Sequence, residues 1–327
     1  MPIHIRPSPL TRRRFVSSML KAVSSAIALA ASKTGSRVYA QETKDDGYEA
    51  WALLSDTHIA ADPELKARGV NMAGHLRQAV QEVLQAHESR VYSGLMINGD
   101  CAYLEGDAAD YTTLGKLIKP ISEKGIPMHL TLGNHDERTH IQAGLAAVFN
   151  ASTMADGRAG AKEIPNLEGK LASKIRGRFC DWYLLDSLDV TNKTPGRLGE
   201  KQIAWLDASL QSAPERPALV MVHHNPQPAG MGKVLGLIDT DALLSLLKER
   251  RQVKALFFGH THVAATLEVE GLHLVNLPAC AYHFNASQPT GWTSALVDPT
   301  GCSLRLFDTG KAHSLHGTEV RLNWRSS

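Results

Sequence analysis

The stretch Met128-His129-Leu130-Thr131-Leu132-Gly133-Asn134-His135-Asp136 carries the pattern that decides the fold. It starts as a short, mainly apolar run and ends in a glycine followed by three side chains that bind metals or transfer protons. A short apolar run bounded by turn residues is typical of a buried strand. The stretch therefore predicts a strand whose carboxyl end carries polar, metal-binding side chains.

The same order recurs at four other places. Apolar runs at 51–54, 94–97, 218–222 and 255–258 lead into Ser55-Asp56-Thr57-His58, Asn98-Gly99-Asp100, His223-His224-Asn225-Pro226 and Gly259-His260-Thr261-His262. In open α/β sheets, ligands bind beyond the carboxyl ends of the strands. The five clusters are therefore expected to form one site, and their Asp, Asn and His content suits transition metals.

Three glycines stand directly before residues of these clusters. They are Gly99, Gly133 and Gly259. A tight turn at a strand end often needs positive φ, which glycine adopts freely. The glycines are therefore expected to let the following side chains turn back over the edge of the sheet.

Strands and helices alternate through most of the chain. Helical patterns occupy 71–87, 115–124, 145–149, 199–210 and 239–251, as in βαβ units. Strand-like alternation follows at 265–269, 272–277, 293–297 and 302–307, with a turn sequence at 298–301. The predicted fold class is α/β: two mixed β-sheets packed face to face and flanked by helices, four layers in one domain over residues 41–310. Residues 151–170 suggest a loop, and 311–327 a surface tail.

The first forty residues have a different composition from the rest. Arg12-Arg13-Arg14-Phe15 precedes an apolar stretch at 22–31 and the small-residue site Val38-Tyr39-Ala40. This order is that of a secretory signal, and the paired arginines resemble the twin-arginine export signal. We expect the twin-arginine export machinery to deliver the chain to the periplasm or outside the cell, with Gln41 as its first mature residue.

Charge and hydropathy limit the kinds of partner. Residues 1–40 hold seven of the 35 basic residues and none of the 33 acidic ones. The mature chain therefore carries 28 basic and 33 acidic residues, a net charge of −5. This balance does not indicate a nucleic-acid surface. No apolar stretch is long enough for a confident membrane span, so no stable membrane anchor is expected. The spacing of the four cysteines matches no zinc motif and leaves disulfide pairing open.

The five clusters appear in the order of the calcineurin-like metallophosphoesterase superfamily, and the resemblance covers about residues 51–278. It implies a site for two transition-metal ions, of Fe, Mn or Zn. By position, the first metal would be held by Asp56, His58 and His262, the second by Asn134, His223 and His260, and both by the bridging Asp100. Such a pair clamps an in-line displacement at phosphorus and makes a bridging hydroxide available near neutral pH as the nucleophile.

Two further residues are predicted to be catalytic. His135 follows a ligand in sequence and is the candidate general acid, while Asp136 would orient its imidazole and raise its pKa. Structural roles are the alternatives, and for Asp136 the alternative is a helix cap. Substrate contacts are predicted at His224, Asn71 and His283, and Arg68 is a further candidate for reaching a phosphate.

Two branches of the superfamily compete. Asp56-x-His58 and the stretch 239–262 look like the class III cyclic-nucleotide and glycerophosphodiester phosphodiesterases, which implies a small-molecule phosphodiester as substrate. Gly99-Asp100 followed by Tyr103 resembles the purple acid phosphatases, which implies a phosphomonoesterase as the alternative. Because His58 already supplies the ligand that such a tyrosine would replace, Tyr103 is expected to pack. A non-catalytic binding scaffold is the remaining hypothesis, and the complete ligand set argues against it.

Overall fold

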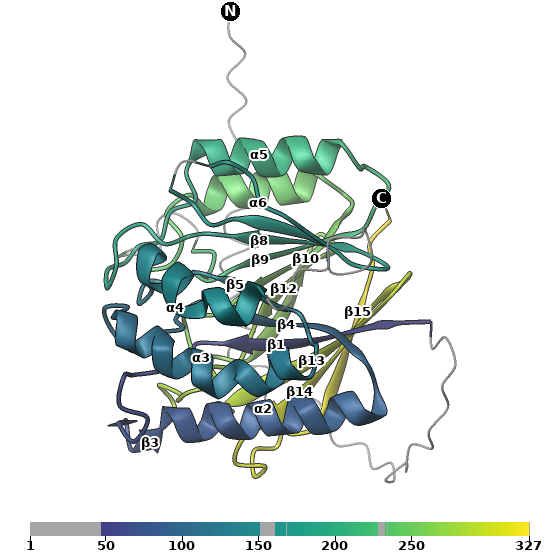
Figure 1. The fold of residues 1–327 in the computed structure, drawn as a ribbon. Helices are drawn as coiled ribbons and strands as arrows, with labels where there is room; N and C mark the ends of the chain where they lie inside the picture. Colours follow the sequence, from purple (N-terminus) through teal and green to yellow (C-terminus); the bar gives the residue numbers. More distant parts are fainter. Residues whose placement is uncertain (1–46, 151–160, 168, 228–232, 234, 327) are drawn as a thin grey trace, which may run out of the picture.

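The chain folds into four layers, and the predicted α/β class is confirmed. The computed structural model describes residues 47–326, except 151–160, 168, 228–232 and 234. Two β-sheets lie face to face, with helices on the outer side of each (Figure 1). The predicted signal at 1–40 lies outside the described residues. No described helix is both long and apolar enough to cross a bilayer.

The first sheet has six strands. Their order is β15 (Glu319–Asn323), β14 (Gly301–Asp308), β13 (Gly291–Asp298), β1 (Glu49–Ser55), β4 (Tyr92–Asn98) and β5 (Met128–Thr131). Strands β1, β4 and β5 are parallel, and β13 joins β1 in antiparallel fashion. Parallel neighbours end at the same edge of a sheet, so the polar clusters that follow β1, β4 and β5 are brought together there.

The second sheet has seven strands. Their order is β11 (Ala265–Val269), β12 (Leu272–Asn276), β10 (Val253–Phe258), β9 (Ala218–Val222), β8 (Asp181–Leu185), β7 (Ser173–Arg176) and β6 (Ala161–Glu163). Strands β8, β9, β10 and β12 are parallel, so the histidine clusters after β9 and β10 also share one edge. A separate small hairpin joins β2 (Lys66–Ala67) to β3 (Val70–Asn71).

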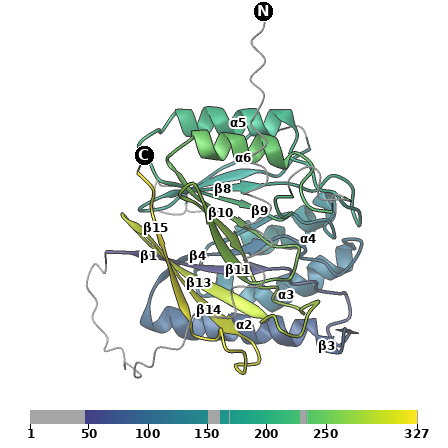
Figure 2. The same ribbon diagram turned by 180° about the vertical axis from the view of Figure 1, so that it is seen from behind.

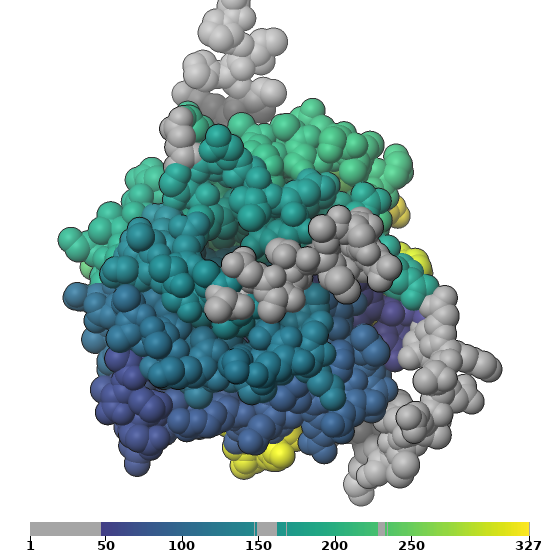
Figure 3. All heavy atoms as spheres, viewed as in Figure 1, coloured from purple at the N-terminus to yellow at the C-terminus, as the bar shows by residue number. Residues whose placement is uncertain are grey.

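Helices cover the outer face of each sheet. The first sheet is covered by α2 (Met72–Ser89), α3 (Ala108–Glu123) and α4 (Arg138–Asn150), and the second by α5 (Glu200–Gln211) and α6 (Thr240–Glu249) (Figures 1 and 2). Helices α3 and α4 both begin earlier in the sequence than predicted. In the space-filling view the N-terminal part of the chain forms the lower half and the middle of the chain the upper half (Figure 3).

The space between the two sheets is filled by large apolar side chains. Trp51 of β1 meets Trp182 of β8 edge to face, with ring centroids 6.0 Å apart, and Phe257 of β10 packs on Trp182 at 5.1 Å. All three side chains are fully buried. Each such side chain contributes about 1.5–3 kcal/mol by leaving water. This core fixes the two sheets against each other and therefore fixes the distance between their polar edges.

The prediction of a surface tail at 311–327 is wrong for its last part. Residues Glu319–Asn323 form β15, which pairs with β14 in antiparallel register. The Arg325 guanidinium, 8% exposed, donates to the carbonyl oxygens of Val253 and Leu247. Val320 and Leu322 alternate with polar residues, which is the pattern of a strand, although only Leu322 is buried.

Candidate metal centre

The five polar clusters meet at one place between the two sheets. Hydrogen bonds extend the strand ladders into the loops: the amide of Asp56 donates to Gly99 (3.1 Å), that of His58 to Asp100 (2.9 Å), and that of Gly259 to His223 (2.9 Å). The side chains at these loops are therefore placed by backbone pairing that continues the sheets. The structure brings together six of the seven residues predicted as metal ligands. The seventh, Asn134, follows Gly133, whose backbone lies against the Asp100 carboxylate.

The strained backbone of the site belongs to residues that are predicted as metal ligands. Asp56, His58, Asp100, His260 and His262 all have positive φ, between 46° and 67°. Such values are uncommon for residues with a Cβ and persist where surrounding structure enforces them, often at functional sites.

The expectation for the three glycines holds only for Gly99, at φ 69°. A Cβ on Gly133 would collide with the Asp100 carboxylate, and one on Gly259 would approach the Asp56 carboxylate to 2.6 Å. These two positions require glycine because the carboxylates pass directly against their backbone.

One group consists of Asp56, His58 and His262, whose ligand atoms all lie within 4.8 Å of one another. The two imidazole Nε2 atoms are 3.2 Å apart, and His262 Nε2 is 3.4 Å from Asp56 Oδ1. The Tyr282 carbonyl oxygen accepts from His262 Nδ1, which fixes the tautomer and leaves Nε2 with a free lone pair. The Tyr282 ring stacks on His58 at 5.1 Å.

A second group consists of Asp100, His223 and His260. His223 Nε2 lies 3.2 Å from Asp100 Oδ2, while its Nδ1 is held by the Asn98 carbonyl at 2.8 Å. His260 Nε2 bonds to the Leu235 carbonyl at 3.1 Å, so Nδ1 is the nitrogen left for a metal. Asn134 adds a buried side-chain oxygen that has no hydrogen-bond partner among the described residues.

Two buried carboxylates set the electrostatics of the centre. Burial by itself would raise the pKa of Asp56 and of Asp100, but His223 and other neighbouring histidines outweigh it and hold both pKa values low. Burial would lower the pKa of His223, but Asp100 and Asp56 raise it to about 10. Burial lowers the pKa of His58 and of His260 to about 4. The centre therefore pairs two ionised carboxylates with neutral imidazoles at His58 and His260, while His223 holds a proton that a bound cation would displace.

The donor atoms fit transition-metal ions. Asn134 Oδ1 is buried without a hydrogen-bond partner among the described residues, although a buried polar atom normally has one. His223 Nε2 faces the Asp100 carboxylate, 3.2 Å away, as two ligands of one cation would. The close Nε2 pair of His58 and His262 is likewise explained by a shared cation. Imidazole nitrogens with carboxylate and amide oxygens are a set that suits Fe, Mn or Zn.

His135 lines the pocket beside these groups. Its amide donates to Asp100 Oδ1 at 2.9 Å, and its Nδ1 donates to the Leu104 carbonyl at 2.7 Å. A carbonyl oxygen only accepts, so the proton on Nδ1 is fixed and Nε2 is the nitrogen available to a substrate. The ring thus has the orientation that proton transfer at Nε2 needs.

The predicted role of Asp136 is corrected, because its carboxylate is occupied away from the His135 ring. It accepts from the amides of Cys101 (3.0 Å), Ala102 (3.1 Å) and Gly133 (2.9 Å), and from the Tyr111 hydroxyl (3.1 Å). The side chain is fully buried, and burial together with Asp100 raises its pKa to about 6. Asp136 ties the loop after β4 to the loop after β5, and the Leu104 carbonyl orients His135 instead.

Two of the predicted substrate contacts lie away from the pocket. His224 is fully buried, its Nδ1 is bonded to Ser187 Oγ at 2.8 Å, and its ring packs on His260 at 4.9 Å. It supports His260 from behind and presents no surface to a substrate. His283 is absent from the pocket wall, which its neighbours Tyr282 and Phe284 line instead. The Tyr282 and Phe284 rings lie near each other, with centroids 6.0 Å apart, and both line the pocket.

Asn71, the third predicted contact, is the N-cap of α2. Its side-chain oxygen accepts from the Gly74 amide, and its Nδ2 donates to the Pro63 carbonyl at 2.9 Å. Both ends of the amide are therefore used within the fold.

Replacing Asn71 by Ala is expected to lower the free energy of unfolding by about 1 kcal/mol, because an amide of the first helical turn loses its acceptor. Substrate KM should not change. Chemical denaturation gives the first value and steady-state kinetics the second. A raised KM with unchanged stability would show that Asn71 binds substrate after all.

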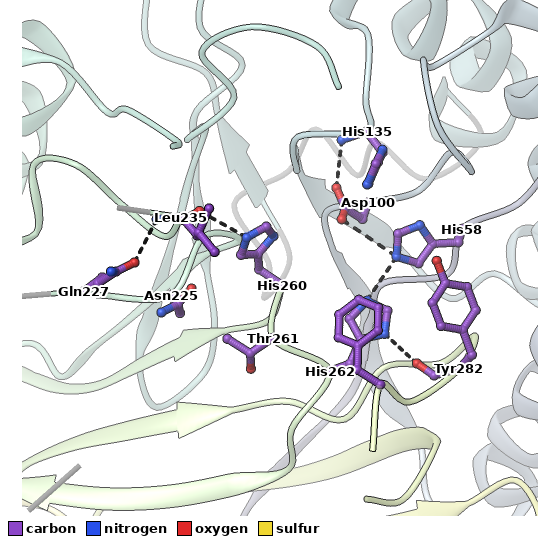
Figure 4. Close-up of a pocket in the computed structure, with 11 residues that line it drawn as sticks. His58, Asp100, His135, Asn225, Gln227, Leu235, His260, Thr261, His262 and Tyr282 are labelled. Atoms are coloured by element: carbon purple, nitrogen blue, oxygen red, sulfur yellow. Dashed lines mark hydrogen bonds and ion pairs between the residues drawn. The ribbon is translucent and has the colours of Figure 1, made fainter. Parts of the chain in front are cut away.

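The pocket over the centre has a volume of about 380 Å³. His58, His262 and Tyr282 stand on one side and His260, Asn225 and Gln227 on the other, with Asp100 between them (Figure 4). Six residues of the pocket wall were not predicted from the sequence: Asn225, Gln227, Leu235, Thr261, Tyr282 and Phe284. The signal for some of them was present, because Asn225 and Thr261 lie within the histidine clusters themselves.

Tyr103 packs as expected. It is partly buried and lies against the apolar cluster beneath the first sheet. His58 stands in the first ligand group, and its Nε2 lies 3.8 Å from Asp100 Oδ2.

The chain resembles known proteins in sequence and in fold. It is 28% identical over 260 residues to the 3′,5′-cyclic adenosine monophosphate phosphodiesterase CpdA of Pseudomonas aeruginosa, covering 79% of this chain and 85% of that one. It is 29% identical over 233 residues to CpdA of Escherichia coli K12, covering 71% and 76%. A dimetal phosphatase of Danio rerio shares the fold, with a TM-score of 0.61, 16% identity, and coverage of 86% and 100%. A sequence model described as calcineurin-like phosphoesterase matches residues 52–264, and the chain belongs to this family.

Proposed function

We propose that this protein hydrolyses phosphodiesters with two transition-metal ions bound at the centre. The observation that carries the proposal is the convergence of two ligand groups: Asp56, His58 and His262 in one, Asp100, His223 and His260 in the other. The names of the relatives support a diester, since those in Pseudomonas aeruginosa and Escherichia coli are cyclic-nucleotide phosphodiesterases. Cyclic nucleotides are therefore the first substrates to test.

The side chains divide into binding and proton-transfer roles. Asp56, His58 and His262 would hold the first ion, Asn134, His223 and His260 the second, and Asp100 both. When bound, the two ions would acidify a water molecule and offset the negative charge of the phosphoryl oxygens. Asp100 also accepts from the amide of His135, so the same carboxylate sets the position of the general acid.

His135 would protonate the departing ester oxygen through Nε2. In the imidazolium form, Nδ1 stays bonded to the Leu104 carbonyl while Nε2 carries the proton to be transferred. After the transfer, the neutral ring keeps its Nδ1 proton and its orientation. A carbonyl partner thus allows the proton to move without rotation of the ring.

Replacing His135 by Asn is expected to lower kcat by roughly 10²–10⁴-fold for a diester with an alkoxide leaving group. The loss should be much smaller for 4-nitrophenolate, which leaves without protonation. Steady-state kinetics on both kinds of substrate measure the difference. His140→Asn is the matched control, since this imidazole bonds to the Gly106 carbonyl outside the pocket. Equal losses on both substrates would contradict the role as general acid.

The proposed function is tested with the chain beginning at Gln41, reconstituted separately with Mn, Fe and Zn. The kcat/KM for bis(4-nitrophenyl) phosphate is compared with that for 4-nitrophenyl phosphate, and 3′,5′-cyclic nucleotides and glycerophosphodiesters are assayed beside them. A ratio above one for diester over monoester supports a phosphodiesterase. A ratio well below one would make the protein a phosphomonoesterase, and no hydrolysis with any metal would support a binding scaffold.

Export by the twin-arginine machinery is also part of the proposal. It rests on the order of basic, apolar and small residues in 1–40. Replacing Arg12, Arg13 and Arg14 by Lys in the full chain is expected to abolish export in a bacterial host, because the receptor reads the arginines. Fractionation of the host compares the two chains, and equal export of both would contradict this route.

A further inference from the structure

The β2–β3 hairpin displays an arginine where its backbone favours another residue. Its strands pair Lys66 with Asn71 and Ala67 with Val70, so the turn consists of Arg68 and Gly69 alone. Both have positive φ, 51° and 81°. Two-residue turns with positive φ at both positions strongly prefer Asn-Gly, and a long side chain is disfavoured at the first of them. The backbone therefore does not account for arginine at position 68.

The Arg68 guanidinium lies against the aromatic wall of the pocket. Its central carbon is 4.7 Å from the centre of the Phe284 ring and 5.7 Å from that of Tyr282, and both rings line the pocket. Phe284 is 53% exposed and stacks on His262 at 4.0 Å and 19°. Since His262 covers one face of Phe284, the guanidinium is assigned to the other. It lies one aromatic ring beyond the metal centre.

The positive charge of Arg68 has no carboxylate partner within ion-pair distance among the described residues. The side chain is exposed, and its contacts are with the two rings. A guanidinium that packs over a ring keeps its N–H donors directed outward from its edge. The Arg68 guanidinium thus presents a positive charge and several N–H donors, with no acceptor, at the rim of the proposed phosphoester pocket.

We propose that Arg68 binds an anionic group on the retained arm of the substrate. The retained arm is the ester group that stays bonded to phosphorus when His135 protonates the other ester oxygen and that group leaves. The scissile phosphoryl group belongs at the ligand cluster, on the far side of Phe284 from the guanidinium. A retained arm that follows the Tyr282 and Phe284 rings away from the metal centre reaches the Arg68 guanidinium. The substrate class is therefore a phosphodiester whose retained arm carries a carboxylate or a second phosphate. This inference rests on the proposed phosphodiesterase function.

The test uses three diesters with the same leaving group, 4-nitrophenolate. The retained arm is 4-carboxyphenyl, 4-(phosphonomethyl)phenyl or the neutral 4-methylphenyl group, so the arms separate carboxylate, phosphonate and uncharged ligands. The metal-loaded wild type is expected to favour at least one anionic arm over the neutral one by about 10-fold or more in kcat/KM, the effect of a charged hydrogen bond. In Arg68→Asn this preference should disappear through a higher KM, with less than about 2-fold change on the neutral diester.

Matched variants separate binding from stability and from general charge. Asn suits the turn, so Arg68→Asn should melt no lower than the wild type. Arg68→Lys should keep part of the preference, because charge remains while the fork is lost. Lys66→Asn removes a positive charge from the same hairpin and should leave the preference intact.

If Arg68→Asn lowered kcat/KM equally for all three diesters, or for none of them, the assignment of Arg68 to the retained arm would be overturned. A wild type that hydrolyses the three diesters without an anionic preference would contradict this inference alone. A wild type that hydrolyses none of them would contradict the proposed function and remove the basis of the inference.

Discussion

Asp100→Asn is expected to abolish phosphodiesterase activity and to weaken metal binding more than any other single substitution. Asp100 stands between the two groups: Oδ2 lies 3.2 Å from His223 Nε2 and 3.8 Å from His58 Nε2. An amide keeps the shape but loses the negative charge that would hold both ions. Breaking a buried charge pair costs about 3–5 kcal/mol, so metal affinity should fall on the order of 10²–10³-fold or more.

Calorimetric titration of the metal-free protein with Mn measures this loss directly. Asp107→Asn is the control, because it makes the same chemical change on an exposed residue of the same loop. Asp107→Asn should bind metal as the wild type does. If Asp100→Asn retained the affinity and stoichiometry of the wild type, a bridging role for Asp100 would be ruled out.

Asp136→Ala is expected to lower the stability of the metal-free protein by about 3 kcal/mol or more. Three amides and the Tyr111 hydroxyl lose their acceptor inside a fully buried site. Each buried donor left unsatisfied costs about 1–3 kcal/mol, although water entering the cavity recovers part of this. At about 2–4 °C per kcal/mol, the melting temperature should fall by roughly 6–12 °C.

Graded variants test whether this effect belongs to the hydrogen-bond network. Tyr111→Phe removes one donor to Asp136 and one acceptor for the Glu137 amide, so it should destabilise less than Asp136→Ala. Asp136→Asn keeps an oxygen acceptor, so its melting temperature should lie between those of the wild type and Asp136→Ala. A variant Asp136→Ala that melts with the wild type but loses turnover would instead restore the catalytic role that the sequence suggested.

The arrangement of the centre followed from sequence because its side chains lie at strand ends. An apolar run followed by Asp, Asn or His can be recognised in the sequence, and parallel strands bring such ends to one edge. The same logic identified β1, β4, β5, β9 and β10. It could not identify β8, whose run Asp181–Leu185 contains an Asp and is followed by residues that support the site without belonging to it.

The hydrogen-bond partners of a polar residue are much harder to predict from sequence than its position in the fold. Asp136 follows His135 in sequence, but the turn after β5 directs its carboxylate back to the amides of the neighbouring loop. Asn71 lies near the first cluster, yet its place at the start of α2 commits it to a cap. In both cases the outcome depends on backbone amides left open by the local fold, and composition carries no signal for them.

Anomalous diffraction from crystals of the Mn-loaded protein, with data collected at the manganese edge, shows directly whether the centre binds two ions. Two peaks are expected: one among Asp56, His58 and His262, the other among Asn134, His223 and His260, with the Asp100 carboxylate contacting both. A single peak at full Mn occupancy, or peaks that lie away from these seven side chains, would contradict this expectation.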